Sequence, residues 1–468
     1  MAAVIILSYR FLIILIINII LLFWSKQYDC CCCCYEDYDE RLNVLNQKMS
    51  SNNEKSIDLI LNLTKSLHNS GTNLLLCPYS LLTTLSMLIA GSRGKTRNEL
   101  LKVLYSETRL SNDEEIQQFL QKISKKHQEF IETYKNVWHQ ASMVYCRDDL
   151  KLDSSFVQSL TKMFQAQTKQ LNFHSIKDSV RIINEDVYKE TKGFVENIVN
   201  DLDPEIALLL IDAIHFKDIW DKQFDQNKSH LQSFRLSDGK TTVETWMMHQ
   251  TAVFNYYEYE SLNVRAIRLP YRSNQRLAML IILPSDNGSV DDDGGVGGGG
   301  GDSAIKTLTK QMNQNHLKAI LDGMLATAPQ KIELSLPRFK ISSTHQHLIE
   351  HFRQSGLCLL FDQCQADLSA MLTNDDDGKK QQQQQQQQCS NVVENPRLYV
   401  SEIMQKAMIE VNEQGTEAIA LTKISVRNKR SAEFIEEMIC DRPFMFMIIL
   451  SDPLNILFSG ILENPLSS

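Results

Sequence analysis

Apolar residues recur at helical intervals in the first part of the folded chain. Residues 53–67 carry apolar side chains three and four positions apart, which predicts an amphipathic helix. The apolar run Leu74–Leu76 predicts a short buried strand. Pro78 then opens a second predicted helix that ends near Ala90, and Thr96 is expected to cap the start of a third.

The spacing of apolar residues then changes from helical to strand-like. After a polar, charged helical region at 112–140, the run Leu208–Phe216 is largely apolar and fits a strand that is buried on both faces. Apolar and polar residues alternate over Lys331–Ile341, where Pro337 marks an edge or bend. Further strands are predicted at residues 141–145, 266–270, 277–284, 445–450 and 455–462. Helices followed by mixed strands, without regular alternation, predict one large α+β domain.

The N-terminus has the composition of a targeting segment. Arg10 precedes an apolar run, Phe11–Trp24, that is shorter than the roughly 20 residues a membrane-spanning helix needs. We therefore expect a cleaved secretory signal over residues 1–25, with an uncleaved anchor as the alternative because no clear cleavage site is visible. Residues 26–52 are expected to form a low-complexity linker rich in cysteine.

Other sequence signals favour an extracellular protein. N-glycosylation sequons begin at Asn62, Asn227 and Asn287. The eleven cysteines do not resemble a dense disulfide framework, because five are consecutive, Cys30–Cys34, and the rest are scattered.

The net charge argues against one class of function, and two low-complexity segments interrupt the predicted domain. The formal net charge of −9 argues against a general nucleic-acid binder, since phosphate contacts need clustered Lys and Arg. Residues 285–303 and 374–392 are low-complexity stretches, the first rich in Gly and Asp and the second in Gln. They cannot bury enough apolar surface to order themselves, so we expect surface-loop insertions without a function.

The stretch from Glu410 to Thr422 is the most informative about function. It begins with residues that suit a strand, passes Gly415 and continues with mostly small residues. A basic cluster, Arg-Asn-Lys-Arg, follows at 427–430. Such a segment suits an exposed loop that can also pair as a strand.

Several motifs, in order along the chain, resemble those of the serpin family of protease inhibitors. They are Asn73–Thr96, Asp212–Trp220, Leu336–Phe339, Ala366–Ser369, Ser401–Lys406, Arg442–Phe444, Leu457–Gly460 and Asn464–Pro465. The resemblance covers about residues 53–466. It implies a serpin fold of the α+β class, a single domain with three β-sheets, eight to nine helices and an exposed reactive loop at about 411–440.

The resemblance also implies a mechanism and a set of hinge residues. In the family, which inhibits serine proteases and is not enzymatic, the protease cuts the loop, the loop enters the central sheet as a strand, and the acylated protease is dragged along. The hinge positions that match the family are Glu413, Gly415, Thr416, Glu417, Ala418, Ala420 and Thr422. Side chains alternate along a strand, so Thr416, Ala418, Ala420 and Thr422 would share the buried face, where their small size avoids overpacking.

The family's usual loop spacing places the reactive bond at Lys429–Arg430, and a shift of one residue places it at Arg430–Ser431. Either bond suits a trypsin-like serine protease, whose acidic pocket pairs with Lys or Arg. Arg427 to Arg430 also matches the R-x-K-R pattern cut by furin-like proprotein convertases. A convertase inhibitor and a non-inhibitory serpin, such as a carrier or chaperone, are the alternatives.

By the same resemblance, a hydrogen-bonded cluster under the sheet, the shutter, would include Asn73, Cys77, Ser80 and Gln405. Cys77 stands where serine is usual and Gln405 where histidine is usual, which predicts a looser cluster. Trp220 would lie at the top of the sheet, in the region the family calls the breach.

The remaining expectations concern partners. Lys122, Lys125 and Lys126 share a helix face in the region where some serpins bind heparin, although a solvated face is the default interpretation. The resemblance implies a monomer without a cofactor or metal.

Overall fold

The computed structural model describes residues 56–107, 110, 112–285, 303–373, 398–416 and 435–467. Residues Asn53–Ser468 form one compact unit. The predicted signal and linker, almost all of both predicted insertions and most of the predicted loop lie outside the described residues.

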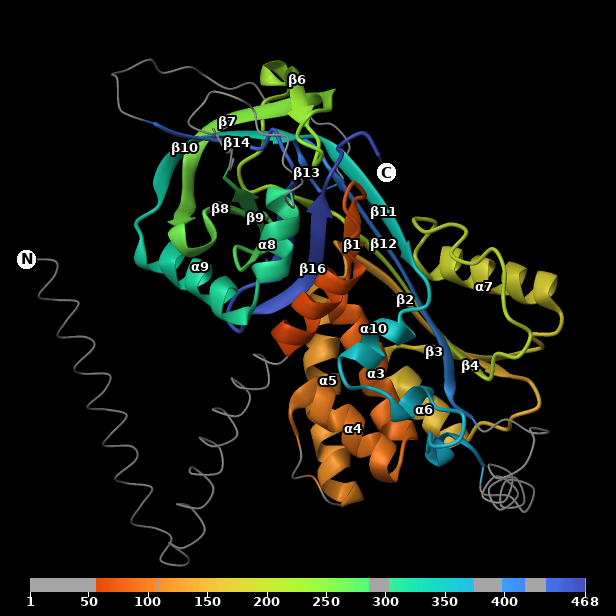
Figure 1. Ribbon diagram of the computed structural model, residues 1–468. Helices are drawn as coiled ribbons and strands as arrows, with labels where there is room; N and C mark the ends of the chain where they lie inside the picture. Colours follow the sequence, from red (N-terminus) through yellow and green to blue (C-terminus); the bar gives the residue numbers. More distant parts are fainter. Residues whose placement is uncertain are drawn as a thin grey trace, which may run out of the picture. The chain divides into compact units, whose positions relative to one another are not determined.

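A central sheet positions the candidate site (Figure 1). Its long strands have the order β3-β2-β4-β12-β11, and two short strands, β13 and β5, continue it. The bounds are β2 (Trp138–Arg147), β3 (Gln167–Leu171), β4 (Leu208–Phe216), β5 (Asp218–Ile219), β11 (Phe339–His345), β12 (Val400–Val411) and β13 (Gly415–Thr416). The predicted strand at 208–216 is confirmed, and every residue of β4 is buried.

A second set of strands has the order β1-β16-β15-β9-β8-β7-β10-β14, with β6 also paired to β7. The bounds are β1 (Leu74–Leu76), β6 (His230–Arg235), β7 (Thr242–Tyr259), β8 (Val264–Pro270), β9 (Leu277–Pro284), β10 (Gln330–Pro337), β14 (Glu436–Ile439), β15 (Phe444–Leu450) and β16 (Asn455–Leu462). The first part of β7 pairs with β6 and β10, and its last residues pair with β8. Among the described strands, the expected three sheets therefore occur with two of them joined through β7.

Helices cover the sheets in separate groups. The described residues contain a helix at 56–67 and eight further α-helices. These are α3 (Pro78–Gly91), α4 (Gly94–Tyr105), α5 (Asp113–Tyr134), α6 (Ser154–Phe164), α7 (Ile176–Glu190), α8 (Ala304–Gln311), α9 (Gln314–Ala326) and α10 (Ile349–Gln354). Figure 1 shows α3 to α6 gathered at one end of the central sheet and α7 lying along its outer face.

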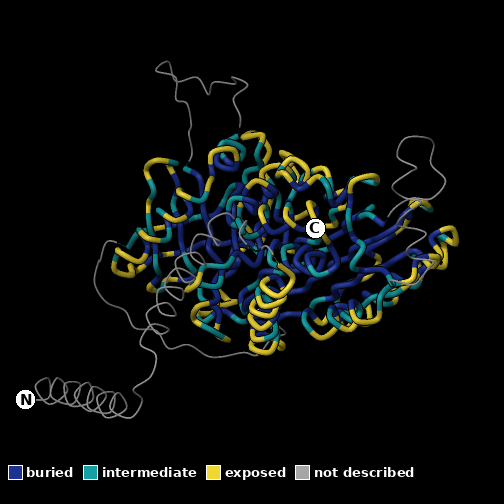
Figure 2. Tube along the Cα trace, turned by 90° about the horizontal axis from the view of Figure 1, so that it is seen from below, coloured by how far each residue is buried: buried dark blue, intermediate teal, exposed yellow. Residues whose placement is uncertain are grey.

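Alternation along β4 divides its side chains between two cores. Leu209, Ile211 and Ala213 pack on the outer side, in the cluster that includes Ile183 and Val187 of α7. Even-numbered residues of β4 face inward, where the largest clusters of buried side chains lie. Figure 2 shows buried segments in the interior of the molecule and exposed residues along its rim. Asp212 is even-numbered, so its carboxyl points into the core.

One predicted helix start is wrong. Thr96 does not cap α4, because that helix begins earlier, at Gly94, where φ is +51°. Thr96 is instead fully buried, and its Oγ1 accepts a hydrogen bond from the Asp367 backbone N–H at 3.0 Å. The Thr96 hydroxyl therefore bonds to a loop that is distant in sequence, whereas the local sequence pattern predicted that it would cap the helix.

Candidate functional site

The strands β4 and β12 run parallel and are hydrogen-bonded directly to each other. Asp212 lies opposite Gln405, and His215 lies opposite Met408. We call this line of contact the seam. It is where an additional strand would enter if the central sheet were to gain one between β4 and β12.

The chain turns back on itself where β12 ends, and we call residues 412–416 the hinge segment. Thr416 lies opposite Val411 of β12 in an antiparallel pair and opposite Asp218 of β5. Because β11 already occupies the other edge of Val411, the hinge segment pairs with β12 on the seam side. The first residues of the predicted loop are therefore already strand residues, in line with the seam.

Gly415 fits this position because it has no side chain. A Cβ atom added there would lie 2.0 Å from the backbone oxygen of Asp218 and 2.7 Å from the Cα of Ile219. Both are backbone atoms of β5, which cannot rotate away as a side chain can. Any other residue would therefore push β13 and β5 apart.

Three consecutive carbonyls of the hinge segment accept hydrogen bonds from residues 220–224. The Trp220 indole Nε1–H donates to Asn412 O at 3.0 Å, and the Trp220 backbone N–H donates to Gln414 O at 2.9 Å. The Phe224 N–H donates to Glu413 O at 2.9 Å. The indole is buried at this end of the seam, as expected for Trp220.

Thr416 is fully buried and bonded through its hydroxyl. Its Oγ1 lies 2.7 Å from the phenol oxygen of Tyr271, whose ring stacks on Trp220 with 4.7 Å between centroids. Burial raises the pKa of Tyr271 well above its ordinary value, so the phenol stays neutral. Thr416 is therefore already buried in this structure, whereas residues 417–422 lie outside the described residues.

Glu413 anchors the hinge segment through its side chain. The carboxylate is 3% exposed and its Oε1 accepts from Ser229 Oγ at 2.5 Å and from Arg338 Nε at 2.7 Å. The Arg338 guanidinium also lies 5.1 Å from the ring centroid of Trp246, in a cation–π arrangement. Sequence reasoning identified Glu413 but missed its two side-chain partners, Ser229 and Arg338. The one available signal was that Arg338 belongs to the Leu-Pro-Arg-Phe motif.

The structure brings Cys77, Ser80 and Gln405 together in one hydrogen-bonded cluster. The buried Gln405 amide accepts from Cys77 N at 2.8 Å and donates to Cys77 O at 2.8 Å and Ser80 Oγ at 3.1 Å. Glutamine thus closes a pair of bonds with the backbone at the start of α3. The cluster is continuous, and the Cys77 backbone takes part in it.

Asp212 completes this cluster and was missed as a site residue. Its Oδ2 accepts from Gln405 Nε2 at 2.9 Å and its Oδ1 from Gln140 Nε2 at 3.1 Å. The residue is 1% exposed, and desolvation raises the pKa of its carboxyl to about 7. The signal in the sequence was one carboxylate within an otherwise apolar buried run.

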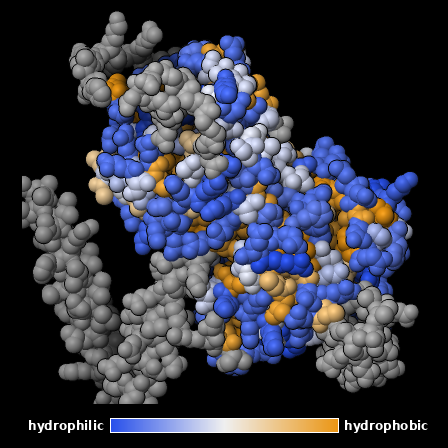
Figure 3. Space-filling view, in the orientation of Figure 1, coloured by the Kyte–Doolittle hydropathy of each residue, from blue (hydrophilic) through white to orange (hydrophobic). Residues whose placement is uncertain are grey.

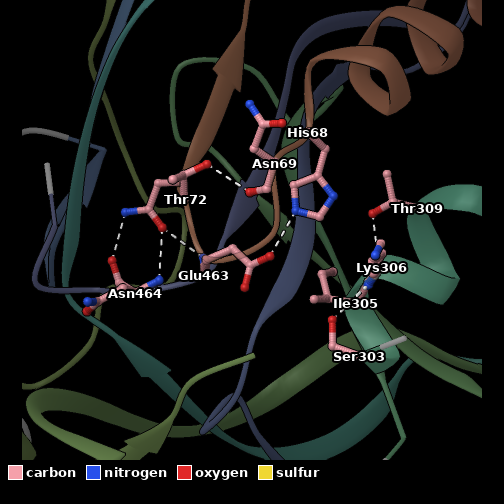
Figure 4. A network of polar contacts seen from close by, with 10 residues as sticks. His68, Asn69, Thr72, Ser303, Ile305, Lys306, Thr309, Glu463 and Asn464 are labelled. Carbon is pink, nitrogen blue, oxygen red and sulfur yellow. Dashed lines mark hydrogen bonds and ion pairs between the residues drawn. The ribbon is translucent and has the colours of Figure 1, made fainter. Parts of the chain in front are cut away.

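Asn73 does not bond within the shutter, contrary to expectation. Its Oδ1 accepts from the backbone N–H groups of Glu463 and Asn464 at 2.8 and 2.9 Å. His68 Nε2 lies 2.8 Å from Glu463 Oε1, whose side chain is fully buried, as Figure 4 shows. Asn73 therefore fixes the segment that follows β16, because its amide matches two adjacent backbone donors there.

Two charged residues of β12, Lys406 and Glu410, each have a partner of their own. Lys406 donates from its Nζ to the backbone oxygen of Glu196, in the segment between α7 and β4. Glu410 pairs with Lys340 across β12 and β11 at 3.5 Å.

The far end of the predicted loop is anchored in the second sheet. β14 pairs in parallel with β10, with Ile332 opposite Glu436. The predicted reactive residues Lys429, Arg430 and Ser431 lie between these two anchors, outside the described residues.

Other predicted surface features can be placed. Lys122, Lys125 and Lys126 are all exposed on α5, and the sequon residues Asn62 and Asn227 are exposed as well. Asn287 lies outside the described residues. Figure 3 shows that the face seen in Figure 1 is mostly hydrophilic, with smaller apolar patches.

The described part of the chain contains no helix long and apolar enough to cross a bilayer. It also contains no group of three or more His, Cys, Asp or Glu residues arranged to hold a metal ion. Its five cysteines, Cys77, Cys146, Cys358, Cys364 and Cys440, form no disulfide bond with one another.

Comparison with known proteins accounts for this arrangement. The family model described as "Serpin (serine protease inhibitor)" matches residues 51–465. The chain belongs to the serpin family. Its similarity to curated serpins extends over most of the chain. It is 28% identical over 410 residues to Iris of Ixodes ricinus, covering 86% of this chain and 96% of that protein. It is also 28% identical over 402 residues to the leukocyte elastase inhibitor of Xenopus laevis, covering 85% and 94%.

Solved serpin structures share the fold. Human thyroxine-binding globulin, complexed with thyroxine, matches with a TM-score of 0.72 and 22% identity, covering 90% of this serpin and all of that chain. Serpin48 of the insect Tenebrio molitor, described as a highly specific serpin, matches with a TM-score of 0.67 and 22% identity, covering 89% and 98%. The predicted serpin fold is therefore confirmed, and relatives include proteins named as protease inhibitors rather than enzymes.

Proposed function

We propose that this serpin is a secreted inhibitor of trypsin-like serine endopeptidases that acts by a suicide mechanism. The protease cuts at Lys429–Arg430 or Arg430–Ser431 and forms an acyl complex, and the freed loop enters the seam as a strand. The observation that carries the proposal is the hinge segment, which already pairs in line with the seam.

Continuing the register of the hinge segment gives the positions that an inserted loop would take. Thr416 lies opposite Val411, so Ala418, Ala420 and Thr422 fall opposite Ile409, Ala407 and Gln405. The register with β5 places Thr422 opposite Asp212 on the other side. The inserted residues that would face the core are therefore threonine and alanine, which fit beside buried neighbours.

Insertion also has a thermodynamic rationale. The inserted strand would run antiparallel to both β4 and β12, so one parallel contact would be replaced by two antiparallel ladders. Antiparallel pairing is slightly more stable per residue, and the loop's unpaired backbone groups gain partners. The uncut state is then metastable, and the free energy released on insertion drives the displacement of the protease.

The basic cluster supports the choice of target class. Lys429 and Arg430 both suit an acidic specificity pocket, where a buried carboxylate pairs with the cation. A furin-like convertase is the second candidate, because Arg427 and Lys429 precede Arg430 in its recognition pattern. That candidate requires the cut after Arg430, whereas trypsin-like enzymes accept either bond.

Incubation with trypsin and with furin tests the proposal. A covalent complex that survives SDS, together with the loop fragment in mass spectrometry, is the expected result with trypsin and gives the bond directly. A covalent complex with furin alone would show that the target class is the furin-like convertases. Cleavage of the loop by both enzymes without any complex would rule out inhibition and favour a carrier or chaperone.

Secretion needs its own test. Expression of the full chain in cultured animal cells should deliver it to the medium, with a mass that falls after removal of N-linked glycans. Retention of the full-length chain in the cell membrane would instead support the uncleaved anchor.

A further inference from the structure

Asp212 has neutral groups as its side-chain partners on every element packed against it. Gln405 of β12 and Gln140 of β2 donate to its two oxygens at 2.9 and 3.1 Å. The hydroxyls of Ser142 of β2 and Ser80 of α3 also act on this carboxyl and lower its pKa. The remaining group at this position is Cys77, whose thiol pKa is raised well above its ordinary value by burial and by the nearby Asp212 carboxyl.

Within the described residues, Asp212 has no Lys, Arg or His side chain among its hydrogen-bond partners. A buried carboxylate without a paired cation is costly, because neutral donors replace only part of its hydration. This cost is the reason its pKa rises to about 7. The closed seam therefore favours the protonated, neutral carboxyl.

We propose that Asp212 is a protonation switch for opening the seam, so that ionisation of its carboxyl favours the separation of β4 from β12. The inference rests on the proposed loop insertion, because that step parts these two strands. Asp212 and Gln405 lie directly opposite each other across the seam and are joined by a side-chain hydrogen bond. Parting the strands breaks this bond and admits water, which solvates the carboxylate better than the acid.

The direction of the effect follows from linkage. The raised carboxyl pKa stabilises the closed seam fully at low pH, and this stabilisation is lost as pH rises from about 4, the ordinary value, through about 7. Opening should therefore become easier between weakly acidic and weakly alkaline pH. Above about pH 7 the carboxyl is ionised in both states, so the effect levels off.

Two other titratable groups lie along the seam. His215 is buried on β4, opposite Met408. Lys406 bonds to Glu196 O on the outer side, and burial lowers its pKa from an ordinary value above 10. A control substitution at His215 therefore separates its contribution from that of Asp212.

A synthetic peptide with the sequence of residues 416–427 probes seam opening without any protease. Its incorporation into the intact, full-length protein is measured from pH 5.5 to 8.5 for wild type, Asp212→Asn and the control His215→Gln. The wild-type rate should rise with pH, by up to about tenfold per unit below pH 7, and then level off. Asp212→Asn, which keeps the shape and cannot ionise, should give a flat profile, and His215→Gln should keep the slope.

A second measurement keeps the test decisive if the peptide does not enter at any pH. The midpoint of urea unfolding should fall between pH 6 and pH 8 in wild type and stay constant in Asp212→Asn. The proposal is overturned if the variant keeps the wild-type pH dependence in both measurements, or if wild type shows none. Neither measurement uses a protease. If the protein fails to inhibit trypsin yet shows this pH dependence, the proposed function is refuted and the proposed role of Asp212 is not.

Discussion

Replacing Glu413 by glutamine tests whether the hinge segment is held by a buried charge. The substitution keeps the size of the side chain and one acceptor oxygen but removes the negative charge that faces Arg338 and Ser229. Glu410→Gln is a matched control. That carboxylate lies three residues earlier, is 40% exposed and pairs at 3.5 Å with a lysine that is 54% exposed.

The expected magnitude follows from burial. A hydrogen bond to a charged group contributes about 1.5–3 kcal/mol, against about 0.5–1.5 kcal/mol for a neutral one, and Glu413 accepts two such bonds. The Arg338 side chain is 38% exposed, so solvent recovers part of the loss. We expect Glu413→Gln to lower the free energy of unfolding by about 2 kcal/mol, and Glu410→Gln by about 0–1 kcal/mol.

Urea titration followed by tryptophan fluorescence is the suitable assay, because two of the chain's four tryptophans, Trp220 and Trp246, surround the hinge segment. The Glu413 variant should also show altered fluorescence before unfolding. Equal destabilisation by the two substitutions would refute the reasoning, because burial of the pair would then not matter.

Three further predictions address the hinge segment and the loop. Gly415→Ala should displace Thr416 from the seam, because the new methyl group would clash with the backbone of Asp218. The free energy of unfolding should fall by about 2–4 kcal/mol, and unchanged stability would show that β5 can move. Tyr271→Phe should cost about 1–3 kcal/mol by leaving the Thr416 hydroxyl buried without its partner, and adding Thr416→Val should recover most of that loss. Arg430→Ala should reduce trypsin inhibition by about 1000-fold if the cut follows that residue and only slightly if it precedes it, as complex-formation rates would show.

Several buried strands of both sheets could be predicted from sequence, because burial on both faces leaves a continuous run of apolar residues. The run at 208–216 and the strands at 277–284 and 455–462 have the predicted bounds. The predicted helix at 53–67 is also confirmed, beginning at residue 56. In these segments, local periodicity and the tertiary environment require the same residues.

The site was less predictable because its contacts join distant parts of the chain. Ser229 reaches Glu413 across 184 residues, and no local pattern marks a serine for that role. Asp212 stands out in the sequence as the one carboxylate in an apolar strand. Its surroundings follow only from the arrangement of β2, β12 and α3. Asn73 was assigned to the wrong cluster because resemblance gives a position in sequence but not the direction of a side chain.

The position of Arg338 has a mechanical consequence. It lies one residue beyond β10, the strand that pairs with β14 and so holds the far end of the loop, and it also binds Glu413 at the near end. The two described ends of the loop, the hinge segment and β14, are therefore attached to the same strand, β10, and to the residue that follows it. Under the proposed mechanism, cleavage between these two ends would let the hinge side move into the seam while β14 stays in place. Insertion without cleavage would instead require the four residues of β14 to detach from β10, so the stability of this short edge strand would then control the rate of spontaneous insertion.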